Sequence, residues 1–164
     1  MGNMLEGVLP LGYQPDEDIC FLTNGIAATA LAAGDVVALD TVIASQDLTS
    51  GLFTKVRLVA TVGNGNDVVS GTILVALDAI GVGGSGRFGQ AGQFPTKVTS
   101  TASTAVGTKL VAVTGGTALI ASVADVLTGG IKIVGVLMQP ITGATTIVKT
   151  VELSGRNGFG NSGS

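Results

Sequence analysis

Short apolar segments separated by glycine-rich turns run along most of this 164-residue chain, and their spacing predicts an all-β fold. The turns between such strands need the backbone freedom that glycine provides. Several strands at short intervals indicate a small antiparallel β-barrel or β-sandwich. Strands are predicted at residues 35–39, 53–62, 73–79, 87–98, 108–113, 131–139 and 147–153.

Two of these segments show the clearest patterns. Residues 53–62 alternate apolar positions with others, which places one face in the core and leaves Lys55 and Arg57 in solvent. Residues 73–79 are apolar on both faces until Asp78 interrupts them. This is the pattern of a central strand that is covered on both sides.

Two other segments are compatible with a helix as well as with extended structure. Residues 26–33 are small and could form a helix, but glycines bracket them. Residues 118–127 place Leu119, Val123 and Val126 on one helical stripe, while flanking glycine pairs and β-branched residues indicate a short strand and a turn. We favour the strand and turn.

The glycine cluster after the longest apolar run matches a nucleotide-binding motif in its spacing. Gly81, Gly83 and Gly86 fit G-x-G-x-x-G, but that site needs a helix that begins at the third glycine. Two further glycines and Pro95 follow and oppose a helix, and no acidic residue stands ~20 positions further on. We therefore expect Gly83, Gly84 and Gly86 to form a turn that binds no nucleotide.

The chain is expected to form one domain with two extended ends. Residues 1–22 lack a hydrophobic period and predict an extended arm, residues 23–154 predict the barrel body, and residues 155–164 predict a flexible Gly/Ser/Asn tail. The arm is too apolar for a disordered tag, so we expect it to bind a partner, although it could also fold back on its own domain. Its expected anchors are Leu5, Val8, Leu9, Leu11, Tyr13, Ile19 and Phe21.

The composition narrows the range of partners. Hydrophobic residues reach 46% of the chain and aromatic ones only 4%, an apolar content larger than a small barrel needs, which predicts an interface with another copy or with a partner. Eight basic against eleven acidic residues, with no basic run, argue against a nucleic-acid surface. No apolar run approaches the ~18 residues of a membrane helix, and the acidic residues at positions 16–18 oppose a signal peptide.

The residue types that catalysis needs are missing or scattered. The chain has no histidine, which is the usual general base and the commonest metal ligand. Cys20 stands alone, so neither an internal disulfide nor a cysteine metal cluster is expected. The spacing of Asp35, Asp40, Asp78 and Asp125 does not bring these carboxylates together. We therefore predict a protein that is not an enzyme and has no catalytic residues, cofactor or metal.

Three pieces of sequence carry a resemblance to a known family. They are AGDVV at residues 33–37, VALDAI at 75–80 with GQFPTKV at 92–98, and IVGVL at 133–137 with the closing strand at 147–153. Through them the chain resembles the capsid decoration, or cement, proteins of tailed bacteriophages, which are small β-proteins rich in Gly, Ala, Val and Thr.

The resemblance implies a small β-barrel or β-tulip-like body on the outer surface of an icosahedral phage head, where it ties neighbouring capsomers together. It implies the major capsid protein as a partner, a homotrimer, and a virion location after synthesis in the host cytoplasm. The alternatives are another phage structural protein, such as a head-fibre base or a minor capsid component, and a ligand- or glycan-binding β-module. The last is opposed by the scarcity of aromatic side chains for a sugar platform.

Overall fold

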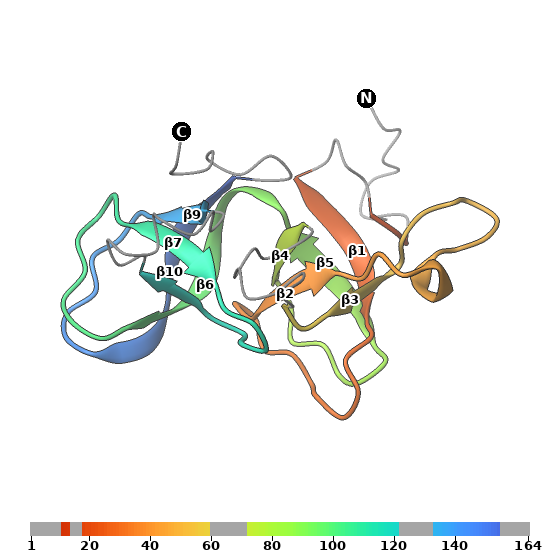
Figure 1. Cartoon of the computed structure of the whole chain (residues 1–164), viewed down its shortest axis with the longest axis horizontal. Coiled ribbons are helices and arrows are strands. Elements are labelled where there is room, and N and C mark those ends of the chain that lie inside the picture. The colour runs from red at the N-terminus through yellow and green to blue at the C-terminus, as the bar shows by residue number, and fades with distance from the viewer. Residues whose placement is uncertain (1–10, 14–17, 60–71, 122–132, 155–164) are drawn as a thin grey trace, which may run out of the picture.

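The computed structural model describes residues 11–13, 18–59, 72–121 and 133–154 (Figure 1). Its elements are β1 (Ile19–Asn24), β2 (Val36–Leu39), the 3-10 turn η1 (Ile43–Ser45), β3 (Lys55–Arg57), β4 (Ile73–Ala76), β5 (Ser85–Gly89), β6 (Ala91–Ser100), β7 (Lys109–Ala112), β8 (Leu119–Ala121), β9 (Ile133–Leu137) and β10 (Thr145–Ser154). The predicted all-β class is confirmed, and no helix forms over residues 26–33.

Within the described residues the strands close into two barrels of five strands each, in the orders β1-β3-β2-β4-β5 and β6-β8-β7-β9-β10. The prediction of a β-barrel is confirmed, but the body contains two barrels in place of one. Each barrel also includes one parallel pair, β1 with β3 and β6 with β8, where an antiparallel sheet was expected. The pattern of strands along a sequence does not show where a sheet closes on itself, so neither feature could be foreseen from it.

The two barrels repeat one architecture. When β1 to β5 are matched in order to β6 to β10, every pairing recurs. The first strand lies parallel to the third, and the remaining four pairs are antiparallel in both barrels. The chain therefore contains an internal structural duplication, with the change from one barrel to the other at Gln90.

The duplication extends to single hydrogen bonds. Before the second strand of each barrel, Gly34 N–H donates to Ala76 O over 2.8 Å and Gly107 N–H donates to Leu137 O over 2.8 Å. These two glycines share a positive φ, +94° and +88°, which favours glycine at both places. Reciprocal backbone bonds also recur between Leu31 and Ile80 and between Thr104 and Ile141.

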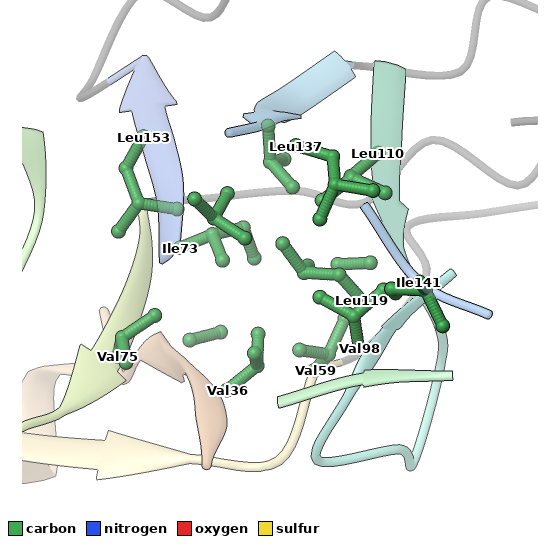
Figure 2. Close-up of a cluster of buried hydrophobic side chains, with 14 residues drawn as sticks. Val36, Val59, Ile73, Val75, Val98, Leu110, Leu119, Leu137, Ile141 and Leu153 are labelled. Carbon is green, nitrogen blue, oxygen red and sulfur yellow. The ribbon is translucent and has the colours of Figure 1, made fainter. Parts of the chain in front are cut away.

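Strands β2 and β4 are buried on both faces, which confirms the two-sided pattern predicted over residues 73–79 for the part that forms β4. One face of each strand lines the interior of the first barrel, and the other face packs against the second barrel (Figure 2). The resulting apolar cluster joins Val36, Ala38, Val59, Ile73 and Val75 to Val98, Leu110, Leu119, Leu137, Ile141, Val151 and Leu153. The first barrel therefore contributes one face of β2 and β4 to the core of the second barrel, while its own interior forms a separate apolar cluster.

Polar contacts fix how the first barrel sits on the second. The Lys97 ammonium on β6 pairs with the carboxylate of Asp35, which is 5% exposed. Lys97 N–H also donates to Gly34 O over 2.8 Å, and Val36 N–H donates to Thr117 O over 2.9 Å. The entry into β2 is thus bound to the second barrel by backbone and side chain together.

Among the predicted segments, one is divided between two strands and another is described only in its first part. The strand expected at residues 87–98 is divided between β5 and β6, and a Cβ at Gly89 would lie 2.7 Å from the Phe94 ring, so glycine is needed where the chain passes between barrels. In residues 118–127, β8 confirms the predicted strand. The remainder of that segment and the predicted tail at residues 155–164 lie outside the described residues.

Candidate interaction surface

The structure assigns several predicted arm anchors to the first barrel. Tyr13 is 8% exposed within the core of that barrel, and its hydroxyl lies 3.5 Å from the Thr72 hydroxyl. Ile19 and Phe21 lie half-buried in β1. Residues 19–22 are therefore a barrel strand and not an arm, because alternate side chains of β1 are buried in the core.

Leu11 is the predicted anchor that the structure leaves exposed, at 47%. The residues after it are tied down, since Gly12 N–H donates to Phe21 O and Tyr13 N–H donates to Phe53 O, each over 2.8 Å. The chain that precedes Leu11 thus starts from a fixed point on the first barrel. The remaining anchors, Leu5, Val8 and Leu9, lie outside the described residues.

The connection between β2 and β3 distinguishes the first barrel from the second. It runs from Asp40 to Thr54, whereas its counterpart between β7 and β8 spans only Val113 to Ala118. We call residues 40–54 the insertion loop. Figure 1 shows it as the orange to yellow loop that projects at the right-hand end of the molecule.

The outer part of the insertion loop is held by its own hydrogen bonds. Asp47 N–H donates to Leu52 O over 2.8 Å, and Gly51 N–H donates back to Asp47 O over 2.7 Å. The Asp47 carboxylate accepts from Thr49 N–H over 2.9 Å and from the Ser50 hydroxyl over 2.8 Å. The bond from Thr49 N–H, and then that from Ser50, hold the pKa of Asp47 below its ordinary value.

The base of the insertion loop is equally ordered. The Ser45 hydroxyl donates to an Asp40 carboxylate oxygen over 2.6 Å, and Thr54 N–H donates to Ser45 O over 2.9 Å. On this scaffold Leu48 is 87% exposed and Val42 is 52% exposed. An apolar side chain on a loop already fixed by hydrogen bonds can be buried by a partner at little further entropic cost. This surface could not be predicted from the sequence, because one leucine among polar residues makes no pattern.

The candidate carboxylates have separate structural partners in the described residues. Asp35 takes part in the ion pair at the barrel junction, and Asp40 holds the base of the insertion loop. Asp78 accepts from the Arg87 guanidinium over 2.6 Å and from Arg87 N–H over 2.9 Å, bonds that hold the pKa of Asp78 below its ordinary value. Asp125 lies outside the described residues. Within the described residues, the other three carboxylates each bind a different partner and are not brought together.

The glycines after β4 form the expected turn in part. Gly84 N–H donates to Gly81 O over 3.0 Å, and Gly83 has a φ of +71°, as a tight turn requires. Gly86 lies in β5 instead, where a Cβ would stand 2.6 Å from Ile80 Cδ1. Gly86 is therefore needed for close packing and not for the turn.

The described residues contain neither a cluster of potential metal ligands nor a membrane-spanning helix. Histidine, cysteine, aspartate and glutamate side chains do not gather there in a group of three or more that could hold a metal ion. Helices long and apolar enough to cross a membrane are likewise not found in that part of the chain.

Comparison with known proteins gives a distant structural likeness. No protein-family model matches the chain, and no curated protein matches it. The structure is similar to the head fiber gp8.5 N base of bacteriophage phi29, with a TM-score of 0.45 and 11% identity over 84% of this chain and 97% of that one. A likeness at this level is too weak to transfer a function to this chain.

Proposed function

We propose that this chain is a structural protein of a tailed-phage virion, and that it binds the outer surface of the assembled head as a homotrimer with the major capsid protein as its partner. The sequence resemblance over residues 33–153 supports this proposal. The candidate carboxylates in the described residues, each engaged in a structural contact, agree with a binding role.

The observation that carries the proposal is the fixed root of the arm. Tyr13 is buried in the first barrel and Leu11 is exposed, so the point where the arm leaves the body lies between them. A segment that starts from a fixed point loses less freedom on binding than one attached to a loose chain. The anchors that remain for a partner are Leu5, Val8, Leu9 and Leu11.

Binding of this kind would stabilise a head without any chemistry. A protein that binds the assembled shell and not its separated subunits lowers the free energy of the assembled state by mass action. Full burial of one Leu or Val side chain contributes about 1.5–3 kcal/mol before ordering costs are subtracted. Four such anchors, multiplied over many copies on one shell, would have a large combined effect.

The test uses purified heads of the phage that encodes the chain. Heads are mixed with the full-length protein, with a deletion of residues 2–10, or with no protein, and binding is measured by co-sedimentation. The deletion stops before Tyr13 because that side chain belongs to the core. We expect the deleted protein to fold and to bind at least about tenfold more weakly, a loss that corresponds to about 1.4 kcal/mol. Lys55→Ala, at an exposed barrel position, is the control and should bind normally.

Heating the same particles and scoring DNA release separates binding from stabilisation. Undecorated heads that survive as well as decorated ones would contradict the stabilising role. Normal binding by the deleted protein would contradict the role of the arm. Binding confined to a few fibre-bearing positions, in place of the whole shell, would favour a head-fibre base.

A further inference from the structure

Charge is divided unequally between the two halves of the chain. Nine of the eleven acidic residues but only three of the eight basic ones precede Gln90, which gives this half a net charge of −6 and the rest a net charge of +3. The residues before β1 and those of the insertion loop together carry six acidic side chains and no basic one. Such a division favours contact between the acidic part of one molecule and the basic part of another.

The ion pairs of the structure leave this division in place. Asp78 and Arg87 both belong to the first half, so their pair does not change its net charge. Asp35 and Lys97 belong to different halves, and their pair removes one charge from each. The first half therefore remains acidic and the second remains basic.

The acidic half carries an exposed apolar side chain on the insertion loop. Leu48 follows Asp47 at the outer part of the insertion loop and is 87% exposed. The hydrogen bonds within residues 46–53 fix the backbone that carries it. Figure 1 shows the insertion loop at the end of the first barrel that faces away from the second barrel.

The basic half presents its own exposed apolar side chain at the opposite end. Val106, in the connection between β6 and β7, is 55% exposed, and Lys109 at the start of β7 is exposed beside it in the chain. This connection is also held, because Gly143 N–H donates to the Ser103 hydroxyl oxygen over 3.0 Å. In Figure 1 it is the green loop at the left-hand end, opposite the insertion loop along the longest axis.

We propose that the partner of the insertion loop is a second copy of this chain, so that the insertion-loop surface of one protomer binds the surface around Val106 (the Val106 surface) of the next. In this arrangement Leu48 of one protomer packs against the surface around Val106 of the next, and Asp47 faces Lys109. Both halves of the contact combine an apolar side chain with a charge of the required sign. The association is a property of the isolated protein and does not depend on binding to a phage head.

Such a contact joins two different surfaces, so every open assembly keeps one free insertion-loop surface at one end and one free Val106 surface at the other until a ring closes. Closure at three copies would give the homotrimer proposed above. This asymmetry makes the contact testable in a way that a two-fold symmetric contact is not.

The test uses one variant of each surface. Leu48→Asp disables the insertion-loop surface and Val106→Asp disables the Val106 surface. Both positions are exposed enough for the fold to tolerate the change. Sedimentation velocity over a range of protein concentrations should show that the native chain self-associates and that each variant alone raises the dissociation constant by about tenfold or more. Val82→Asp, a 58% exposed valine in the turn before β5, is the matched control and should associate like the native chain.

Mixing the two variants gives the decisive measurement. The Val106→Asp protein keeps an intact insertion-loop surface, which can bind the intact Val106 surface of the Leu48→Asp protein. An equimolar mixture should therefore form a dimer although neither component does so alone. Added salt should weaken this dimer, because screening shortens the reach of the charges. A mixture that stays monomeric, a native chain that stays monomeric, or a Leu48→Asp protein that associates normally would overturn the proposal.

Discussion

The two barrels have the same topology, yet they differ in what surrounds them. The first carries the insertion loop and the root of the arm, whereas the second has a short turn from Val113 to Ala118 in the place of that loop. Backbone hydrogen bonds that recur in both, such as those of Gly34 and Gly107, define the common scaffold. What only one barrel possesses is not needed to close a barrel, so the insertion loop and the arm are the places to look for function.

The apolar cluster that joins the two barrels provides the strongest test of whether they are separate units. Leu119 is fully buried in the second barrel, and Leu119→Ala should lower the free energy of unfolding by about 2–5 kcal/mol. The chain has a single tyrosine and no tryptophan, so Tyr13 fluorescence reports on the first barrel alone. In urea, this fluorescence transition should shift together with the circular dichroism of the whole chain.

Leu48→Ala is the matched control for that experiment, because it makes the same substitution at a side chain that is 87% exposed. Its effect should stay within about 0.5 kcal/mol. A Tyr13 transition that does not move in Leu119→Ala would show that the barrels unfold independently, despite the apolar cluster that joins them in Figure 2.

The ion pair between the barrels should matter more than the ion pair within the first barrel. Lys97→Met leaves the Asp35 carboxylate, whose side chain is only 7% exposed, without its counter-charge. We expect a loss of about 2–3 kcal/mol, less than for a fully buried pair because the Lys97 side chain is 27% exposed. Chemical denaturation should show a smaller effect for Arg87→Met, whose pair is exposed to solvent.

The double replacement Asp35→Asn with Lys97→Met distinguishes a lost attraction from an uncompensated charge. It should recover much of the stability lost in Lys97→Met, because the buried carboxylate is then gone. A double variant no more stable than Lys97→Met would mean that the isolated carboxylate costs little and that the lost attraction accounts for the effect of Lys97→Met.

Equivalent glycines in the two barrels offer an internal control. Gly34→Ala and Gly107→Ala introduce the same backbone strain, about 1 kcal/mol, because both glycines have a positive φ. At Gly34 the new Cβ would also approach Val148 Cγ2 to 3.1 Å, whereas at Gly107 nothing lies within 4 Å. Gly34→Ala should therefore be the more destabilising of the two, by about 1 kcal/mol, in urea titrations. Equal effects would mean that the junction yields to the added methyl group.

The sequence indicated the strands better than it indicated their closure. The two-sided apolar pattern is confirmed by β4, which is buried on both faces, and the exposed position of Lys55 was predicted correctly. The expected exposure of Arg57 was only partly met, since that side chain is half-buried. The duplication could not be predicted from the sequence, because it lies in backbone hydrogen bonds that many sequences can make. It leaves few identical residues at equivalent positions, such as Gly34 and Gly107.

The candidate surface was harder to predict, for a different physical reason. Apolar residues such as Tyr13, Ile19 and Phe21 look the same in a sequence whether they contact their own barrel or a partner. The alternative that the arm folds back on its own domain holds for Tyr13, whereas Ile19 and Phe21 belong to β1 and are half-buried there. Leu48 lies in a polar stretch, and only the hydrogen bonds around it reveal that the loop presents it to solvent.

The smallest expected effect concerns acid pH and the first barrel alone. The bonds from Arg87 hold the pKa of Asp78 below its ordinary value of 3.8. A carboxyl whose pKa is lower in the folded state than in the unfolded one stabilises the fold fully above pH ~3.8, and that contribution is lost as the pH falls through the folded pKa. In Arg87→Met this contribution is removed, so the stability advantage of the native chain should be constant from neutral pH down to about pH 4 and shrink below it. Urea midpoints measured at successive pH values would show this convergence.

The second barrel has Gln139 in the place of Asp78, where its side-chain oxygen accepts from Thr150 N–H over 3.0 Å. An amide does not titrate in this range, so Gln139→Ala should lower stability by the same amount at every pH, and a pH-dependent loss there would contradict the assignment of the acid sensitivity to Asp78.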